Sequence, residues 1–371
     1  MRALITTDTV GGVWTFTQEL AGQLLSRGWS IHLVSLGRAP SEAQQRWFER
    51  TATQCSGQFS WAALDVPLEW MEENHRAWDE AAPALARMVQ EFGAQALHSN
   101  QLCFGALPVN IPRIVTAHSD VLSWARACRE APLEDSPWLR QYLQLVRRGL
   151  SQAHAIVAPT EWMANSLLDN FPLQKRPLVI ANGRTISPDD RSPRKLQAIT
   201  AGRLWDEAKN VGMLGDVRSP VPLLIAGDAQ GGSGTTKVAP SGVTFLGSLA
   251  SEELLQIFRE SAMYLCTSRY EPFGLAPLEA ALCGCAVLAN DIPSLREVWR
   301  DGALYFHDAE SLTTLLNQVS KAPDELSAAQ QRSLERARRF TADRMASGYE
   351  QLFQHWITHA EEAMLCPAVS A

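Results

Sequence analysis

The sequence predicts an α/β protein made of two domains, each with a parallel β-sheet covered by helices. Three observations support this. The length of 371 residues exceeds that of an ordinary single domain and suits two. Short apolar strands alternate with amphipathic helices along the chain, which is the pattern of parallel sheets. A polar stretch at 184–195 contains two prolines and no apolar period, so it marks a domain boundary.

The N-terminal domain is expected over residues 1–183. It opens with a strand at 3–6, a helix at 14–27 and a strand at 31–36, which together form a βαβ unit. We expect no regular structure over 38–80, a polar segment rich in tryptophan. Its tryptophans serve either as an acceptor-binding surface or, more commonly, as core. The later strands of this domain are predicted at 96–99, 114–116, 155–158 and 178–180.

The C-terminal domain is expected over residues 184–342, where the alternation of strands and helices starts again. A glycine-rich segment at 231–234 is predicted to be a flexible loop, and a last amphipathic helix is predicted over 343–362. Two Rossmann-like halves place a ligand in the cleft between them. The strands of this domain are predicted at 198–201, 223–226, 243–246, 264–267, 286–289 and 303–306.

Composition narrows the classes of function. The formal net charge of -7 argues against a nucleic-acid partner bound through an overall basic surface. The seven cysteines cannot all pair, and none stands in a Cys-x-x-Cys motif, so we expect reduced thiols and no structural metal. The N-terminus does not resemble a signal peptide, and no apolar stretch reaches the ~18 residues of a membrane span. These features predict a cytoplasmic protein, with peripheral membrane contact at most.

The segment 264–298 combines a strand, a loop and a helix. Glu271 and Gly274 lie in the loop, and the helix is expected to begin near 276–277, with Glu279 in its first turn. A helix N-terminus after a glycine-containing loop binds phosphate, whereas carboxylates accept hydrogen bonds from hydroxyl groups. The segment therefore suits a ligand with both a diphosphate and a sugar. The alternatives are a surface acid at Glu271 and, at Glu279, a carboxylate favoured by the helix dipole.

Three other positions stand at the ends of predicted strands. Arg203 and Lys209 share one loop, and both cations suit a diphosphate, although solvated surface cations are the alternative. Gly247 ends a strand where backbone groups could meet a nucleobase. His118 follows a strand at the edge where α/β proteins bind ligands, and its alternative is a structural histidine.

The pair Gly11 and Gly12 precedes the first helix. It does not complete a Gly-x-Gly-x-x-Gly fingerprint, and no acidic residue closes the second strand, so we reject a dinucleotide site. The pair either lets a ligand approach the backbone or forms a plain tight turn.

The motif Glu271-Pro-Phe-Gly-Leu-Ala-Pro-Leu-Glu279-Ala resembles the signature of retaining GT-B glycosyltransferases of the glycogen-synthase-like superfamily, in particular glycosyltransferase family four. The resemblance covers nearly the whole chain and implies a GT-B fold, in which two Rossmann-like domains face each other across a cleft. It also implies that the helix at 343–362 crosses back to the N-terminal domain. The other motifs that follow the order of the family are Gly11-Gly12, Asn182-Gly183, Gly202-Arg203-Leu204 with Lys209, Gly227-Asp228 and Phe245-Leu246-Gly247.

This resemblance implies a retaining hexosyltransferase that uses a UDP- or GDP-sugar, needs no cofactor and acts on a saccharide, lipid-linked or small-molecule acceptor. Metal independence is consistent with the lack of an Asp-x-Asp motif. Two departures from the family pattern are the longer loop before Lys209 and the sequence Asn182-Gly183-Arg184, which lacks the usual Val-Asp. By this resemblance, Arg203 and Lys209 would bind the diphosphate, and Gly11 and Gly12 would approach it. Gly247 would make a backbone contact, and the N–H groups of Phe273, Gly274 and Leu275 would bind phosphate or sugar. Glu279 would bind the ribose, whereas Glu271 and His118 would position the sugar.

Two alternatives remain open on the same scaffold. One is a nucleotide-sugar epimerase or hydrolase, which would turn over the donor without an acceptor. The other is a non-catalytic protein that binds a nucleotide-sugar.

Overall fold

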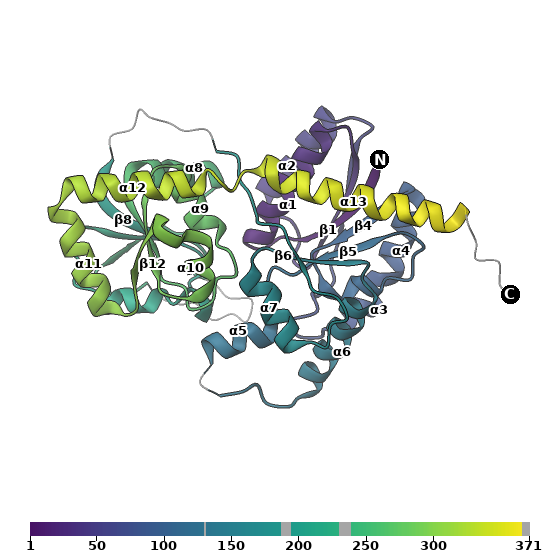
Figure 1. The fold of residues 1–371 in the computed structure, drawn as a ribbon, viewed down its shortest axis with the longest axis horizontal. Helices are drawn as coiled ribbons and strands as arrows, with labels where there is room; N and C mark the ends of the chain where they lie inside the picture. The colour runs from purple at the N-terminus through teal and green to yellow at the C-terminus, as the bar shows by residue number, and fades with distance from the viewer. Residues whose placement is uncertain (130, 187–193, 230–238, 366–371) are drawn as a thin grey trace. The chain divides into compact units, whose positions relative to one another are not determined.

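The computed structural model describes residues 1–129, 131–186, 194–229 and 239–365. The described chain divides into two compact units (Figure 1). The first contains residues 1–123, 131–183 and the segment from 342 onward, and the second contains 124–130 and 184–341. The change of unit therefore falls between Gly183 and Arg184. The predicted loop at 231–234 lies outside the described residues.

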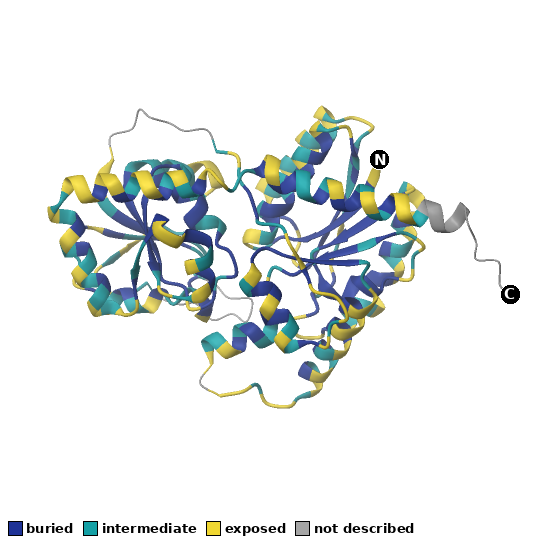
Figure 2. Ribbon diagram, in the orientation of Figure 1, coloured by how far each residue is buried: buried dark blue, intermediate teal, exposed yellow. Residues whose placement is uncertain are grey.

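The first unit is built on a seven-stranded sheet in the order β3-β2-β1-β4-β5-β6-β7, and all its strand pairs are parallel. Its central strands are buried because helices cover both faces of the sheet. Figure 2 shows these strands in dark blue. The strands are β1 (Arg2–Asp8), β2 (Ser30–Leu36), β3 (Phe59–Leu64), β4 (Ala96–Ser99), β5 (Arg113–Thr116), β6 (Ala155–Ala158) and β7 (Leu178–Val179).

The helices of the first unit follow the strands along the chain. Apolar side chains of α4 pack on β1, β2 and β4, and those of α6 and α7 pack on β5 and β6. The helices are α1 (Gly12–Ser26), α2 (Glu42–Gln54), α3 (His75–Asp79), α4 (Ala81–Phe92), the 3₁₀ helix η1 (Leu102–Ala106), α5 (Val121–Cys128, which extends into the second unit), α6 (Pro137–Gln152), α7 (Glu161–Asn170) and α13 (Ala342–Leu365).

The expectation of no regular structure over 38–80 was wrong. This segment contains α2, the edge strand β3 and the short α3. Ser41 opens α2 with a capping box, but the helix buries only Phe48, so its apolar period is weak. The Phe48 ring stacks on Trp61 of β3, with ring centroids 4.3 Å apart. Trp61 is thus packed within the unit, whereas Trp70 is 40% exposed.

The helix α13 returns the chain to the first unit and corresponds to the helix predicted over 343–362. Arg27 at the end of α1 forms ion pairs with Asp343 and Glu350 of α13 at 2.6 and 3.0 Å. Deeper in the unit, the Tyr349 hydroxyl lies 2.9 Å from the Thr116 hydroxyl on β5. Because Tyr349 is fully buried, this helix completes the core of the first unit.

The second unit is built on a six-stranded sheet in the order β10-β9-β8-β11-β12-β13, again with parallel pairs. All six strands were predicted from the apolar runs. The strands are β8 (Lys195–Ala201), β9 (Leu223–Ala226), β10 (Val243–Phe245), β11 (Ser261–Cys266), β12 (Ala286–Asn290) and β13 (Ala303–Phe306).

The helices of the second unit cover a core that joins β8, β9, β11 and β12 to α11 and α12. In Figure 1 the sheet of this unit lies between the helices. The helices of this unit are η2 (Glu207–Lys209), η3 (Val211–Asp216), α8 (Ser251–Glu260), α9 (Leu275–Leu282), α10 (Pro293–Trp299), η4 (Arg300–Gly302), α11 (Ala309–Lys321) and α12 (Pro323–Ala337).

Glycines hold together the loops at the carboxyl end of this sheet. The Gly202 N–H donates to the Ala226 carbonyl at 3.0 Å, and the Gly227 N–H donates to the Gly247 carbonyl at 2.8 Å. Gly227 has φ 142°, and a Cβ there would overlap the Gly202 carbonyl oxygen. The loops after β8, β9 and β10 therefore meet backbone to backbone, and a side chain at Gly227 would separate them.

Two helical glycines of the first unit should respond oppositely to alanine. A Cβ at Gly149 of α6 would overlap the Leu102 carbonyl oxygen of η1, whereas a Cβ at Gly22 of α1 meets nothing within 4 Å. We expect Gly149→Ala to lower the free energy of unfolding by about 1–3 kcal/mol through overpacking. Gly22→Ala should raise it by about 0.5–1 kcal/mol through helix propensity.

Urea unfolding of both variants checks this pair of predictions. Equal effects of the two substitutions would contradict the close approach of α6 and η1.

Candidate active site

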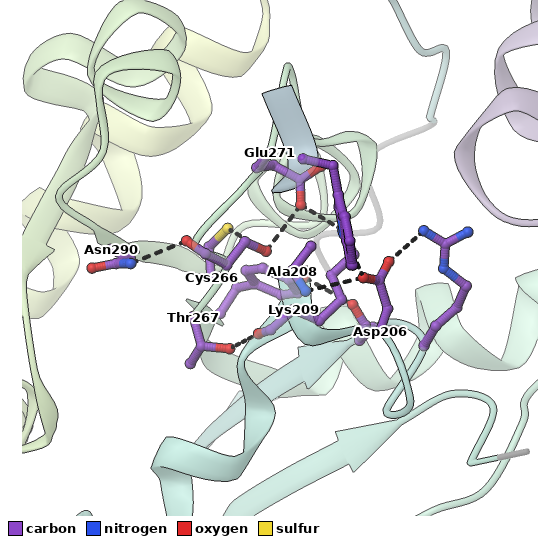
Figure 3. A network of polar contacts seen from close by, with 12 residues as sticks. Asp206, Ala208, Lys209, Cys266, Thr267, Glu271 and Asn290 are labelled. Atoms are coloured by element: carbon purple, nitrogen blue, oxygen red, sulfur yellow. Dashed lines mark hydrogen bonds and ion pairs between the residues drawn. The ribbon is translucent and has the colours of Figure 1, made fainter. Parts of the chain in front are cut away.

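A partly buried ion pair lies at the carboxyl edge of the second unit's sheet. The Lys209 ammonium lies 2.5 Å from a Glu271 carboxylate oxygen, and the side chains are 23% and 13% exposed. The Ser268 hydroxyl donates to the same oxygen at 3.0 Å. Figure 3 shows Lys209 and Glu271 pointing toward each other. The structure thus joins two of the predicted site residues directly, although they lie 62 residues apart in the sequence.

The loop after β8 aims the Lys209 side chain. Lys209 ends the 3₁₀ helix η2, and Asn210 follows in the left-handed conformation with φ 48°. The stem of Lys209 passes Gly202, where a Cβ would lie 3.4 Å from its Cδ. Burial lowers the pKa of the Lys209 ammonium, but the attraction of Glu271 outweighs it, so the pKa is raised on balance. Lys209 therefore carries a positive charge at neutral pH.

Arg203 is held by a different carboxylate in the same loop. Its guanidinium lies 2.6 Å from Asp206 and 5.1 Å from the centroid of the Trp205 ring. Asp206 also accepts the Ala208 N–H at 3.0 Å. Burial raises the pKa of Asp206, but Arg203 and the Ala208 N–H bring it below its usual value. The loop thus presents two cations, each paired with one carboxylate.

Backbone contacts join this loop to the loop after β11. The Thr267 hydroxyl donates to the Lys209 carbonyl at 2.6 Å, and the Arg269 N–H donates to the Ala208 carbonyl at 2.8 Å. The Asn290 amide, at the end of β12, donates to the Ser268 carbonyl at 3.1 Å. Figure 3 shows Asn290 and Thr267 in this network. The positions of Lys209 and Glu271 are therefore fixed by the ends of β11 and β12.

The helix α9 begins at Leu275, directly after Gly274, which has φ 90°. A Cβ at Gly274 would lie 2.8 Å from Pro277 Cγ and 3.2 Å from Glu271 Cγ, so a glycine is required where the helix starts. The expected start near 276–277 was slightly late. Glu279 is consequently the fifth helical residue and lies in the second turn, so its predicted place in the first turn was wrong.

Glu279 is paired with Arg184, a contact that the sequence did not predict. The Arg184 Nε lies 2.8 Å from a Glu279 carboxylate oxygen, and the side chains are 13% and 12% exposed. Arg184 stands at the start of the second unit, next to one of the departures from the family pattern. Phe273 lies in the loop before α9 and is buried, with its ring 5.3 Å edge-on from Phe340.

Gly247 lies beside the same edge, in the loop after β10. Its carbonyl accepts the Gly227 N–H, its φ is 74°, and a Cβ would meet nothing within 4 Å. The glycine is therefore needed for backbone conformation, and open space faces its α-carbon.

In the first unit, a polar cluster lies at the carboxyl edge of the sheet near the start of α1. Gly11 caps α1 with φ 69°, and Gly12 is its first residue. His118 Nε2 lies 2.8 Å from the Asn100 side-chain oxygen, and its ring lies 4.5 Å edge-on from Phe16 of α1. The Asn100 amide donates to the Thr6 carbonyl at 2.6 Å, which orients the side chain that holds His118.

Burial keeps the imidazoles in this cluster neutral. It lowers the pKa of His118 to about 3 and also that of the nearby His98 to about 3. A neutral His118 has one donor nitrogen and one acceptor nitrogen, so it can position a hydroxyl without adding charge.

Sequence reasoning missed several polar partners of these residues. The pairing of Asp206 with Arg203 could have been predicted, because an acidic residue three positions after an arginine in one loop can reach it. Asn100 follows β4 as His118 follows β5, and neighbouring strand ends meet at one edge of a parallel sheet. Glu69 carried no such signal. It is 4% exposed, it accepts the Leu102 N–H at 2.8 Å, and burial raises its pKa to about 7.

Two family models match the chain. The model for Glycosyltransferase Family 4 matches residues 10–187, and the model for Glycosyl transferases group 1 matches residues 218–338. The chain belongs to glycosyltransferase family 4. The family resemblance predicted from the motif around Glu271 is thereby confirmed.

Curated relatives of this family-4 protein are about one quarter identical to it over the stretches that match. Alpha-maltose-1-phosphate synthase of Mycobacterium tuberculosis is 26% identical over 60% of this chain and 65% of its own length. D-inositol 3-phosphate glycosyltransferase of Gordonia bronchialis is 24% identical over 68% of this chain and 64% of its own length. The matches thus span slightly less than two thirds of these relatives.

Solved structures confirm the predicted α/β GT-B fold of this family-4 protein. Sucrose-phosphate synthase from Thermosynechococcus elongatus has a TM-score of 0.76 at 17% identity and covers 96% of this chain and 99% of its own. HepE of Anabaena, solved with UDP and glucose, has a TM-score of 0.71 at 19% identity, with 96% and 100% covered. At these identities the likeness concerns the fold.

Neither a membrane-spanning helix nor a cluster of metal ligands is found in the part of the chain that the structure describes. Within the described ranges, none of the helices is both long enough and apolar enough to cross a bilayer. Among the same residues, no three His, Cys, Asp or Glu side chains gather as a metal site would require.

The histidines of this cluster, His98 buried and His118 partly buried, predict how stability depends on pH. The pKa of His118 is about 3 in the folded protein and about 6.5 in the unfolded chain, so the unfolded chain binds more protons between these values. Stability should therefore fall as the pH drops below about 6.5. Between pH 7 and pH 5, the free energy of unfolding should fall by about 1–2 kcal/mol less in His118→Gln than in the wild-type protein.

Urea unfolding at pH 7 and pH 5 measures this difference, with the exposed His307→Gln as the matched control. An unchanged pH dependence in His118→Gln would contradict a neutral, partly buried imidazole.

Proposed function

We propose that this family-4 protein is a retaining, metal-independent hexosyltransferase. It transfers a sugar from a UDP- or GDP-sugar to a saccharide, lipid-linked or small-molecule acceptor. The observation that carries the proposal is the pairing at the sheet edge of Lys209, in the loop after β8, with Glu271, the first residue of the family motif. The relatives named as synthases and glycosyltransferases support the same class of reaction.

The diphosphate of the donor would bind beside the loop after β8. Arg203 offers a forked set of donors and Lys209 a compact charge, and both suit phosphate oxygens. The N–H groups at the start of α9, from Phe273 to Leu275, would add the donors of a helix N-terminus. As the bond from the sugar to the phosphate breaks, negative charge grows on the diphosphate. These groups would stabilise that charge without a metal ion.

The donor sugar would lie near Glu271, whose carboxylate can accept hydrogen bonds from sugar hydroxyls while it holds Lys209. His118 of the first unit, with Gly11 and Gly12 beside α1, would complete the sugar and diphosphate contacts. Gly247 would face the nucleobase, and Glu279 the ribose. Glu271 and His118 act as positioning groups in this proposal, and attack of the acceptor occurs on the face from which the diphosphate departs.

The acceptor would contact the first unit, at the carboxyl edge where Asn100 and His118 lie. We place the reaction in the cytoplasm, with membrane contact through a peripheral surface at most.

A thermal-shift screen over UDP-, GDP- and ADP-sugars, followed by an acceptor screen with the donor that stabilises most, tests the proposal. We expect one UDP- or GDP-sugar to raise the melting temperature and to be consumed when an acceptor is present. Turnover of the donor without acceptor would favour the epimerase or hydrolase. Binding without turnover of any acceptor would favour a non-catalytic binding protein, and no stabilisation by any nucleotide-sugar would contradict the proposal.

Removing the Lys209 charge should impair transfer much more than binding of the acceptor. We expect Lys209→Met to lower kcat/KM by about 10²–10³, because a donor that stabilises the leaving group is lost. Lys195→Met is the matched control, since Lys195 is 64% exposed and pairs with Glu260 away from the motif loops. Its kcat/KM should stay within about twofold of the wild-type value.

Initial rates of transfer for both variants, with melting temperatures measured alongside, give the comparison. Equal losses in the two variants would argue against a special role of Lys209.

A further inference from the structure

Arg184 occupies a fixed place at the point where the chain enters the second unit. Its backbone N–H donates to the Phe340 carbonyl at 3.1 Å, just before the chain leaves the same unit at Thr341. The Phe340 ring in turn contacts Phe273 of the motif loop. Arg184 is thus tied through Phe340 to the loop that precedes α9.

The side chain of Arg184 reaches Glu279, as described above, in a pair with little exposure. A carboxylate with so little access to water depends on a partner of opposite charge, and that partner also holds its side chain in one conformation. A carboxylate has about four lone-pair sites, so in general it can pair with a guanidinium and also accept hydrogen bonds from the hydroxyl groups of a ligand.

We propose that Arg184 is a positioning residue for recognition of the donor ribose. It keeps the Glu279 side chain oriented, so that the carboxylate accepts hydrogen bonds from the ribose hydroxyls of a nucleoside diphosphate. This inference rests on the proposed function, because it takes the ribose as the group that Glu279 contacts. It adds a residue outside the motif, at a position where this chain departs from the family pattern.

Arg184 has no direct contact with the nucleotide in this proposal, so its effect passes through Glu279. A structural role alone would weaken the binding of all nucleotides equally. A role in ribose recognition changes instead the ratio between the affinity for a ribonucleotide and that for its deoxy analogue.

The experiment measures, by calorimetry, the binding of UDP, GDP and their 2′-deoxy and 3′-deoxy analogues to the full chain. For the nucleotide that binds more tightly, we expect the wild-type protein to prefer the ribose form by about tenfold or more, as for a hydrogen bond to a charged group. Arg184→Gln should reduce this preference to about that of Glu279→Gln. The double variant Arg184→Gln with Glu279→Gln should show no further loss.

Arg296→Gln is the matched control, because this arginine forms an ion pair with Asp291 at 2.6 Å with a side chain that is 51% exposed. Its ribose preference should equal that of the wild-type protein. Arg184→Lys keeps the charge without the same geometry, so its preference should lie between those of the wild type and Arg184→Gln. If Arg184→Gln does not fold, the double variant and Arg184→Lys still give the comparison, since removing both charges of a buried pair costs less than removing one.

Three results would overturn the inference. The first is that Arg184→Gln keeps the ribose preference of the wild-type protein. The second applies if Arg184→Gln does not fold, and is that Arg184→Lys keeps this preference. The third is that the double variant loses more of the preference than Glu279→Gln does. If the wild-type protein binds none of these nucleoside diphosphates, the proposed function fails as well. If it binds UDP or GDP with the ribose preference and only the Arg184 result is negative, the proposed function stands.

Discussion

The contact between Lys209 and Glu271 is the constraint on which the candidate site depends. A lysine at this depth in the protein needs a nearby anion, and a carboxylate at this depth needs a cation. Each loop brings one member of the pair, and hydrogen bonds from the Thr267 hydroxyl and the Arg269 N–H to backbone carbonyls hold the two loops together. The pair therefore fixes a charged edge on the second unit's sheet, and the other cation, Arg203, is placed by its own carboxylate beside it.

Such an edge is suited to a ligand that brings both negative charge and hydroxyl groups. Lys209 remains charged because Glu271 offsets the effect of burial on its pKa. A diphosphate would add anionic charge near Lys209 and Arg203, while hydroxyl groups would donate to Glu271. The site would bind the donor with groups that are already oriented, so little reorganisation is needed when charge develops on the leaving diphosphate.

The sequence was sufficient for the parts of the fold that rest on local patterns. Apolar runs located all six strands of the second unit, and Pro277 located the start of α9 to within two residues, because proline is favoured in a first helical turn. The helix α2 was missed because its residues are mostly polar and it buries only Phe48. The edge strand β3 was missed although its residues, Phe59–Leu64, are mostly apolar, because the segment 38–80 around it is polar. Periodicity does not reveal a helix such as α2, whose contacts are aromatic rings at the two adjacent positions Trp47 and Phe48 together with a capping box.

The candidate site, like the fold, was predictable from the sequence only in part. The residue types of Arg203, Lys209, Glu271 and Glu279 were available from the motifs, but their partners depend on contacts between distant segments. Arg184 looked like part of a polar linker, and only the folded chain shows its side chain against Glu279. Similarly, the position of His118 after a strand was visible in the sequence, whereas its support by Asn100 and Phe16 required the sheet order.

The central claim is retaining transfer from a nucleotide-sugar. Proton NMR tests it most directly, by following the anomeric proton of the sugar as the purified chain converts the best donor and acceptor to product. The account predicts a new glycosidic bond whose anomeric configuration is the same as that in the donor. A product of inverted configuration, or sugar that appears only in free form in the presence of acceptor, would contradict it.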